Sequence, residues 1–220
     1  MNAILPAAGS ATRMRGIPKF LLPFDLSGRS LIELHVENLL HVSNIIWIPT
    51  KPEFIFLLDA LNFPADRVRI VPAVTENMTQ TVQKIVDLDP SDYFQLVMPD
   101  TYFHGQLPYS TMKSKPEFVD LACWEIRKDQ RGKLGQVKVE NTKVIAIEDK
   151  NPNCEFDHSW GALTFNRDLM SLSKTSDPHI GFAVKSAVDK GLSVTCTIIQ
   201  GKYFDCGTPS EYFSMLSEQD

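Results

Sequence analysis

Residues 3–23 read AILPAAGSATRMRGIPKFLLP. A short apolar run opens this stretch, small residues follow from Ala7 to Ala11, and Arg13 and Lys19 supply positive charge. Small residues let backbone N–H groups approach a ligand closely, and successive N–H groups in a turn form an anion-binding concavity. A guanidinium fork and an ammonium group both suit phosphate oxygens. The stretch therefore predicts a strand followed by a phosphate-binding loop, although an ordinary glycine turn beside two surface cations fits this segment equally well.

The spacing of the glycines excludes one common type of phosphate-binding loop and disfavours another. It does not fit Gly-x-x-x-x-Gly-Lys-Ser/Thr, which excludes the ATPase loop, nor Gly-x-Gly-x-x-Gly, which disfavours dinucleotide binding. The whole chain has 22 basic and 27 acidic residues, a net charge of −5, which argues against a nucleic-acid partner. An anionic ligand must therefore bind where positive charge is concentrated locally.

Short apolar runs alternate with helical patterns through the first half of the chain. Ser30 and Glu33 form a predicted capping box ahead of one helix, and Pro52 stands in the first turn of another. Strands that alternate with helices of this length imply right-handed βαβ units. The prediction is an α/β fold with a Rossmann-like, doubly wound, mixed but mostly parallel sheet flanked by helices. The expected strands are 3–5, 45–48, 68–71 and 94–98, and the expected helices are 30–40, 52–61 and 78–88.

The second half of the chain is richer in expected strands. Two apolar runs around the polar turn 140–142 predict a hairpin, Gly191 marks the end of a helix, and Thr208 opens the last one. We expect one domain over residues 1–220, with a β-rich lobe inserted within residues 105–165. The expected strands are 119–126, 136–139, 144–147, 160–165 and 194–199, and the expected internal helix is 182–190.

Composition excludes several other classes of protein. Of 220 residues, 43% are hydrophobic and 22% charged, as in ordinary globular proteins. No apolar run approaches the roughly 18 residues of a membrane span, and residues 1–15 lack the order of a secretion signal, so we expect a cytoplasmic protein with no membrane partner. The four cysteines show no CxxC spacing, so we expect reduced thiols and no zinc site. The five histidines are scattered, and we expect each to be a surface or hydrogen-bonded side chain.

Two segments of the first stretch, 5–14 and 18–23, resemble the N-terminal signature of the sugar-phosphate nucleotidyltransferases, the family of glucose-1-phosphate thymidylyltransferase and mannose-1-phosphate guanylyltransferase. The family pattern is Leu-Ala-Gly-Gly-x-Gly-Thr-Arg-Leu/Met and then Pro-Lys-x-Leu-Leu-Pro, and Ala11 stands here in place of a glycine. The resemblance implies a catalytic role for Arg13 and Lys19, which would neutralise a triphosphate. It implies nucleotide contacts from Ala7, Ala8, Gly9, Ser10, Ala11, Thr12, Arg13, Lys19, Thr79 and Asp100.

Three further segments are similar to family motifs in the same order along the chain. Residues 97–100, VMPD, look like Leu-Gly-Asp, with Pro99 in place of the glycine. Residues 144–152, VIAIEDKNP, are similar to Val-x-x-Ile-x-Glu-Lys-Pro, with Asn151 as an extra residue. Residues 203–212, YFDCGTPSEY, look like Trp-x-Asp-x-Gly-Thr-Pro-Glu-Asp-Tyr. The resemblance therefore runs through nearly the whole chain.

These motifs imply site residues and a division of labour. Residues 1–104 would bind the nucleotide and residues 105–220 the sugar phosphate, which makes the β-rich lobe a sugar-binding lobe. The base would contact residues 75–81, where Met78 replaces a usual glycine and leaves the base unassigned. Three aromatic strand residues are expected in the core instead, namely Trp124, Trp160 and Phe165. The implied ligands of a Mg²⁺ ion are Asp100 and Asp205, and the implied sugar-phosphate subsite is Gly135, Asp149 (or Glu148 in its place), Lys150 and Gly161. Each of the two aspartates follows a short apolar run, so we expect both to lie at strand ends of one mostly parallel sheet, facing the same crevice.

The implied reaction is attack of a sugar 1-phosphate oxygen on the α-phosphorus of a nucleoside triphosphate, which expels pyrophosphate with the help of Mg²⁺. The two substrates are the expected partners, and a homo-oligomer is compatible with the resemblance. Because the chain ends soon after the last motif, we expect a monofunctional enzyme without an appended acyl- or acetyltransferase domain.

Two alternatives remain open at this point. The Ala-Ala-Gly-x-x-x-Arg-Met and Pro-Lys pattern also looks like cytidylyltransferases that act on alcohol phosphates of the methylerythritol phosphate or phosphocholine type, although the Asp-x-Gly-Thr-Pro segment favours the sugar branch. Ala11, Met78 and Pro99 depart from the family pattern, as in a catalytically silent sugar-nucleotide binder. The argument against silence is the retention of Arg13, Lys19, Asp100, Lys150 and Asp205.

Overall fold

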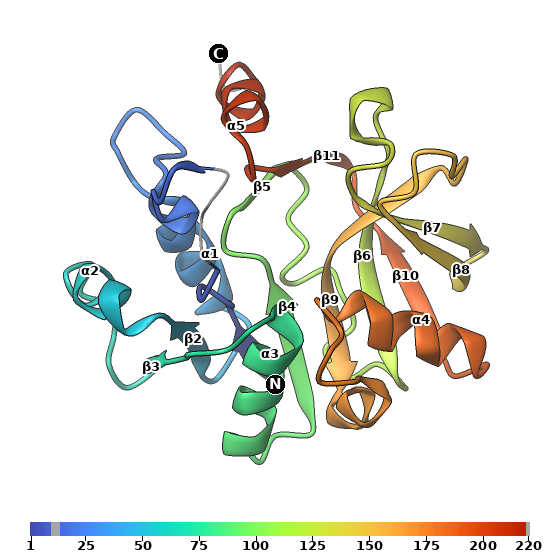
Figure 1. The fold of residues 1–220 in the computed structure, drawn as a ribbon, viewed down its shortest axis with the longest axis horizontal. Helices are drawn as coiled ribbons and strands as arrows, with labels where there is room; N and C mark the ends of the chain where they lie inside the picture. The colour runs from blue at the N-terminus through green and yellow to red at the C-terminus, as the bar shows by residue number, and fades with distance from the viewer. Residues whose placement is uncertain (10–13, 219–220) are drawn as a thin grey trace.

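The computed structural model describes residues 1–9 and 14–218, and a nine-stranded sheet runs through this part of the chain (Figure 1). The strand order is β3-β2-β1-β4-β9-β6-β10-β8-β7. Its strands are β1 (Asn2–Ile4), β2 (Ile46–Thr50), β3 (Val68–Pro72), β4 (Tyr93–Val97), β6 (Val119–Glu125), β7 (Gly135–Glu140), β8 (Lys143–Asp149), β9 (His158–Asn166) and β10 (Val194–Ile198). A second, two-stranded sheet pairs β5 (Thr101–Gly105) with β11 (Gly201–Asp205).

Three of the described α-helices begin at caps that the sequence supplies. The Glu33 carboxylate accepts from the Ser30 N–H at 2.8 Å, as the predicted capping box requires. The Asn77 side chain accepts from the Gln80 N–H, and Thr208 caps the last helix. The α-helices are α1 (Leu31–Leu39), α2 (Ile55–Asp59), α3 (Met78–Leu88), α4 (Gly181–Asp189) and α5 (Pro209–Leu216), and the 3-10 turns are η2 (Lys19–Leu21), η3 (Pro52–Phe54), η4 (Lys128–Gln130) and η5 (Arg167–Leu172).

The mixed α/β class is confirmed, but the sheet is less parallel than predicted. Strands β3, β2, β1 and β4 pair in parallel, whereas β9 runs antiparallel to both β4 and β6. Strands joined by short connections without a crossover helix must pair antiparallel, and β7, β8 and β9 follow one another in this way. The β-rich segment joins the parallel strands through β9, and a further pairing of β7 with β9 closes β9, β6, β10, β8 and β7 into one ring of strands. This mixed strand order does not confirm the Rossmann-like detail.

A buried aromatic cluster supports the small sheet. The Phe103 and Trp124 rings are stacked with centroids 5.1 Å apart, and Tyr203 packs on Trp124 at the same centroid distance. Phe103 belongs to β5 and Tyr203 to β11, so this cluster seats the small sheet on β6. His35 contacts the cluster and is hydrogen-bonded at both ring nitrogens, to the Tyr109 hydroxyl and the Thr101 carbonyl.

Two composition-based expectations can be compared with this structure. All four cysteines are buried, and their thiols are free in this structure. Within residues 1–9 and 14–218, none of the helices has the length and apolar character needed to cross a membrane.

Candidate active site

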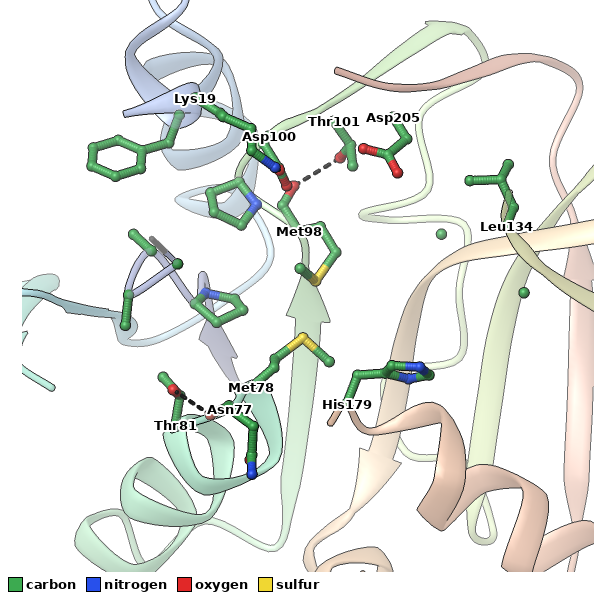
Figure 2. A pocket seen from close by; sticks show the side chains of 18 of the residues that line it. Lys19, Asn77, Met78, Thr81, Met98, Asp100, Thr101, Leu134, His179 and Asp205 are labelled. Atoms are coloured by element: carbon green, nitrogen blue, oxygen red, sulfur yellow. Dashed lines mark hydrogen bonds and ion pairs between the residues drawn. The ribbon is translucent and has the colours of Figure 1, made fainter. Parts of the chain in front are cut away.

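A cavity of about 550 Å³ lies between the carboxyl ends of the parallel strands and the strands of the mixed part of the sheet (Figure 2). Open α/β sheets bind ligands beyond the carboxyl ends of their strands, so its position is that of a ligand site. Its lining consists of residues 6–9, 18–20, 75–78, 98–101 and 133–135 together with Lys51, Thr81, Asp149, Lys150, Trp160, Gly161, His179, Tyr203 and Asp205.

The loop after β1 forms one wall of the cavity. The Ala7 N–H donates to the Pro49 carbonyl at 2.9 Å, and the Thr50 hydroxyl donates to the Ala7 carbonyl at 3.2 Å, so β2 holds the start of this loop. Ala7, Ala8 and Gly9 line the cavity, and a Cβ built at Gly9 meets no atom of the described part of the chain within 4 Å. The other predicted members of the loop, Ser10, Ala11, Thr12 and Arg13, lie outside the described residues.

Asp100 and Asp205 come together through antiparallel pairing. Asp205 is opposite Thr101 in the β5–β11 register, and the Cys206 N–H donates to the Asp100 carbonyl at 2.9 Å. Both aspartates line the cavity, and Figure 2 shows them on the same side of it, on either side of Thr101. The sequence argument expected two strand ends of one parallel sheet, and this part was wrong, because β11 belongs to the small antiparallel sheet.

The two carboxylates produce a strongly negative local field. Burial raises the pKa of Tyr203, and the charges of Asp205 and Asp100 raise it further. Burial also raises the pKa of the Cys206 thiol, again with contributions from both aspartates. Because both aspartates act on the same two groups, their charges are concentrated in one small region of the cavity wall.

Lys19 supplies a cation at this point. Its Nζ lies 2.8 Å from Oδ2 of Asp100, and the two side chains are 15% and 18% exposed. The short turn η2 places the lysine there, directly after Pro18. The two predicted functional groups therefore form a largely buried ion pair across the cavity wall.

The residues present suit a magnesium ion better than a metal cage made of protein groups alone. Among residues 1–9 and 14–218, no group of three or more His, Cys, Asp or Glu side chains could hold a metal ion. Mg²⁺ commonly takes only one or two carboxylates and completes its shell with substrate phosphates and waters. Asp100 and Asp205, two carboxylates beside one cavity, meet that requirement.

The predicted sugar-phosphate residues converge on the opposite wall. Gly135 is opposite Asp149 in the β7–β8 pairing, and the Lys150 N–H donates to the Leu134 carbonyl at 3.2 Å. Lys150 adopts a φ of 49°, a left-handed conformation that costs a non-glycine residue about 1 kcal/mol or more. Such strain persists only where the surroundings fix the conformation, so the lysine is held at a defined place beside the cavity.

The two predicted glycines of this wall are in close contact with aromatic rings. A Cβ at Gly135 would lie 2.4 Å from Nε1 of Trp160, and a Cβ at Gly161 would lie 2.3 Å from Cε2 of Tyr203. Both distances are far shorter than a van der Waals contact. Glycine is therefore required at both positions for packing, and contact of these glycines with a substrate stays a prediction.

Two expectations about individual side chains were wrong. Trp160 was predicted to lie in the core with Trp124 and Phe165, which are indeed buried, but Trp160 is half-buried and lines the cavity. Thr79 was predicted to contact the nucleotide, but its side chain is 2% exposed and does not line the cavity. Because α3 begins at Met78, Thr79 turns inward, whereas Met78 and Thr81 line the cavity.

Sequence reasoning also missed three charged or polar cavity residues, Lys51, Lys133 and His179. Lys51 directly follows β2, so the strand-end rule that identified Asp100 could have found it. Lys133 and His179 lie on loops between elements and carry no local signal. Figure 2 shows Met78 and His179 projecting into the cavity from α3 and from the segment before α4.

Comparison with known proteins identifies the fold. No protein-family model and no curated protein sequence matches the chain. Among solved structures, UDP-glucose pyrophosphorylase complexed with UDP-glucose is similar with a TM-score of 0.81 and 17% identity, covering 99% of this chain and 97% of that one. An inositol-1-phosphate CTP transferase from T. maritima is similar with a TM-score of 0.78 and 16% identity, covering 99% and 95%.

A third structure, described as a glucose-1-phosphate thymidylyltransferase from Bacillus anthracis in complex with sucrose, has a TM-score of 0.80 and 19% identity, covering 99% of this chain and 94% of that one. The three structures share one architecture over nearly the full length of each chain. The motif-based resemblance is thus confirmed at the level of the fold, and the chain has the fold of the sugar-phosphate nucleotidyltransferases.

Proposed function

We propose that this protein transfers the nucleotidyl group of a nucleoside triphosphate to a sugar 1-phosphate and releases pyrophosphate. The observation that carries the proposal is the meeting of Lys19, Asp100 and Asp205 with Lys150 around one cavity. The similar structures support it, because UDP-glucose pyrophosphorylase and glucose-1-phosphate thymidylyltransferase are among them.

The nucleotide would bind on the wall formed by the loop after β1 and the start of α3. Backbone N–H groups of residues 8–12 and the Arg13 guanidinium would bind the triphosphate oxygens. Residues 75–78 would contact the base, since they line the cavity beside the loop after β1. Lys19 would neutralise charge that develops on the leaving pyrophosphate.

The acceptor would bind on the opposite wall. Lys150 would hold its phosphate by a charge-assisted hydrogen bond, and Asp149 would bind the remainder of the acceptor. An oxygen of the acceptor phosphate then forms a bond to the α-phosphorus, the bond between the α-phosphorus and its bridging oxygen to the β-phosphorus breaks, and pyrophosphate leaves. Both substrates are anions, so positioning and charge neutralisation supply most of the rate enhancement.

Asp100 and Asp205 would hold a Mg²⁺ ion at the junction of the two walls. When bound there, the ion would polarise the α-phosphate as a Lewis acid. The concentrated negative charge of the two carboxylates supports a cation at this place.

Cytidylyl transfer to another phosphorylated alcohol is a second candidate. The similarity to an inositol-1-phosphate CTP transferase favours it, because that structure covers 99% of this chain with a TM-score of 0.78. Both candidates use the same chemistry at phosphorus and differ in the base and the acceptor.

The experiment that tests the proposal is a matrix of five nucleoside triphosphates against sugar 1-phosphates and alcohol phosphates, with Mg²⁺, read out as released pyrophosphate. We expect release with one triphosphate and one or more sugar 1-phosphates, and none when Mg²⁺ is removed with a chelator. Release only with alcohol phosphates would favour the second candidate. Absence of release from every pair would contradict both and indicate a silent binder.

A further inference from the structure

A histidine–aspartate pair lies at the acceptor wall of the cavity. Nε2 of His179 is 3.0 Å from Oδ2 of Asp149, and both residues line the cavity. The hydrogen bond from His179 lowers the pKa of the Asp149 carboxyl, burial opposes the shift, and nearby positive charge from Lys150 adds to the lowering. Asp149 is therefore held as a carboxylate.

The backbone fixes which ring nitrogen of His179 carries the proton. The Gly181 N–H donates to Nδ1 of His179 at 3.3 Å, so Nδ1 must be an acceptor. In a neutral imidazole the proton is then on Nε2, which donates to Asp149. Gly181 also permits this arrangement sterically, because a Cβ there would lie 2.9 Å from Nδ1.

The segment that carries His179 is anchored to the nucleotide wall. The Asn77 side-chain amide donates to the Thr175 carbonyl at 2.8 Å, and the Met78 N–H donates to the Pro178 carbonyl at 3.2 Å. The ring of His179 also packs on Phe182 of α4, with ring centroids 5.0 Å apart. The imidazole is thus held from both sides, by the start of α3 and by the start of α4.

We propose that His179 is a positioning residue for the acceptor subsite, where it holds Asp149 in the orientation that accepts a hydrogen bond from a hydroxyl group of the acceptor. A carboxylate accepts several hydrogen bonds, so Asp149 can bind a hydroxyl while it accepts from His179. The acceptor is accordingly a phosphate ester that carries a free hydroxyl group, as a sugar phosphate or a cyclitol phosphate does. This inference rests on the proposed function and adds the substrate group that Asp149 contacts.

The test compares steady-state kinetics of three variants, measured with the acceptor that gives the fastest pyrophosphate release. H179L removes the N–H group that donates to Asp149. We expect the KM for the acceptor to rise about tenfold, because one hydrogen bond to a charged group is lost. The KM for the triphosphate should stay unchanged, since His179 acts on the other wall. H179Q should restore the acceptor KM, because its amide nitrogen can donate from a place close to Nε2. H41L is the control, an exposed histidine outside the cavity, and should leave both constants unchanged.

A double-mutant comparison separates positioning from a direct role. If His179 acts only through Asp149, H179L/D149N should be no worse than D149N alone. Three results would each overturn the inference: effects of H179L and D149N on the acceptor KM that multiply in the double variant, an unchanged acceptor KM in folded H179L, or an equal rise in the KM values of both substrates. None of them touches the proposed function as long as the wild-type enzyme is active. A wild-type protein inactive with every substrate pair would contradict the proposed function and this inference together.

Discussion

The parallel half of the sheet, β3-β2-β1-β4, and its mixed half, β9-β6-β10-β8-β7, place their functional groups by different means. In the parallel half the cavity residues directly follow strand ends, as in the loop after β1 and at residues 98–100. In the mixed half cross-strand register brings them together, as where Gly135 lies opposite Asp149. The first kind of placement depends on local sequence, whereas the second depends on the pairing of segments that are distant in the chain.

The two halves also differ in how tightly their cavity walls are packed. A Cβ at Gly9, in the loop after β1, would meet no atom of the described residues within 4 Å, whereas a Cβ at Gly135 or Gly161 would overlap an aromatic ring. The nucleotide wall therefore leaves room beside its loop, and the acceptor wall is closely packed around its strands. Substitutions should therefore show separately how each half places its functional groups and how tightly each wall is packed.

The largest effect is expected where the halves meet, at the β5–β11 pairing. D100N and D205N each keep the size of the side chain but remove its charge. Each should slow turnover about 1,000-fold, because several kcal/mol of transition-state stabilisation are lost. The double variant should be little worse than either single one, because the two carboxylates act as a unit. Pyrophosphate release measures this, with D66N, an exposed aspartate, as the control. Additive losses in the double variant would show that the two side chains act separately.

The next largest effect tests the tight packing of the acceptor wall. In G161A the new methyl group would meet Tyr203, whose ring cannot move away because it packs on Trp124 and Phe103. We expect a loss of about 2–3 kcal/mol in the free energy of unfolding. Urea unfolding measures it, and G9A should change stability by less than about 0.5 kcal/mol. Equal free energies of unfolding for G161A and G9A would contradict the claim that the acceptor wall is packed more tightly than the nucleotide wall.

Lys150 tests the assignment of the acceptor phosphate. K150A removes one charge-assisted contact, worth about 1.5–3 kcal/mol, so the KM for the acceptor should rise about 10- to 150-fold. The KM for the triphosphate should barely move. K138A, at an exposed position of β7, serves as the matched control. An equal rise in the KM values for both substrates would contradict the assignment of Lys150 to the acceptor phosphate.

The smallest effect concerns pH and the support of the metal-binding junction. Burial lowers the pKa of His35 to about 4 from an ordinary 6.5, so the unfolded chain takes up the proton first as pH falls. The contribution of His35 to stability is complete above pH 6.5 and is lost toward pH 4, about 2 kcal/mol of it between pH 7 and pH 5. Urea unfolding at the two pH values should show this loss in the wild type and not in H35Q. An equal loss in H35Q would assign it to other groups.

Local features of the chain were predictable from sequence. Helix α3 has the predicted bounds, and the capping box at Ser30 forms as expected, because caps and periodicity involve neighbouring residues. The approach of Asp100 to Asp205 was also expected from motifs, although the reason given for it was wrong.

Features that depend on distant pairing were not predictable. Strand β5 carries no strong local pattern and exists because β11 pairs with it over the aromatic cluster. The pairing of β9 with β4 and β6 places Trp160 beside the cavity, and no single segment encodes that pairing. His179 meets Asp149 because α4 packs beside β8, which is a contact between segments distant in the sequence.

The most direct test of nucleotidyl transfer is a ³¹P NMR spectrum of the wild-type protein incubated with Mg²⁺, a triphosphate and a sugar 1-phosphate. Transfer predicts that pyrophosphate and a new diphosphate diester appear in equal amounts while both substrates disappear. D205N under the same conditions should show no change over the same time. Orthophosphate or a free nucleoside monophosphate in place of the diester would mean that water attacks the triphosphate, and would contradict transfer between the two walls of the cavity.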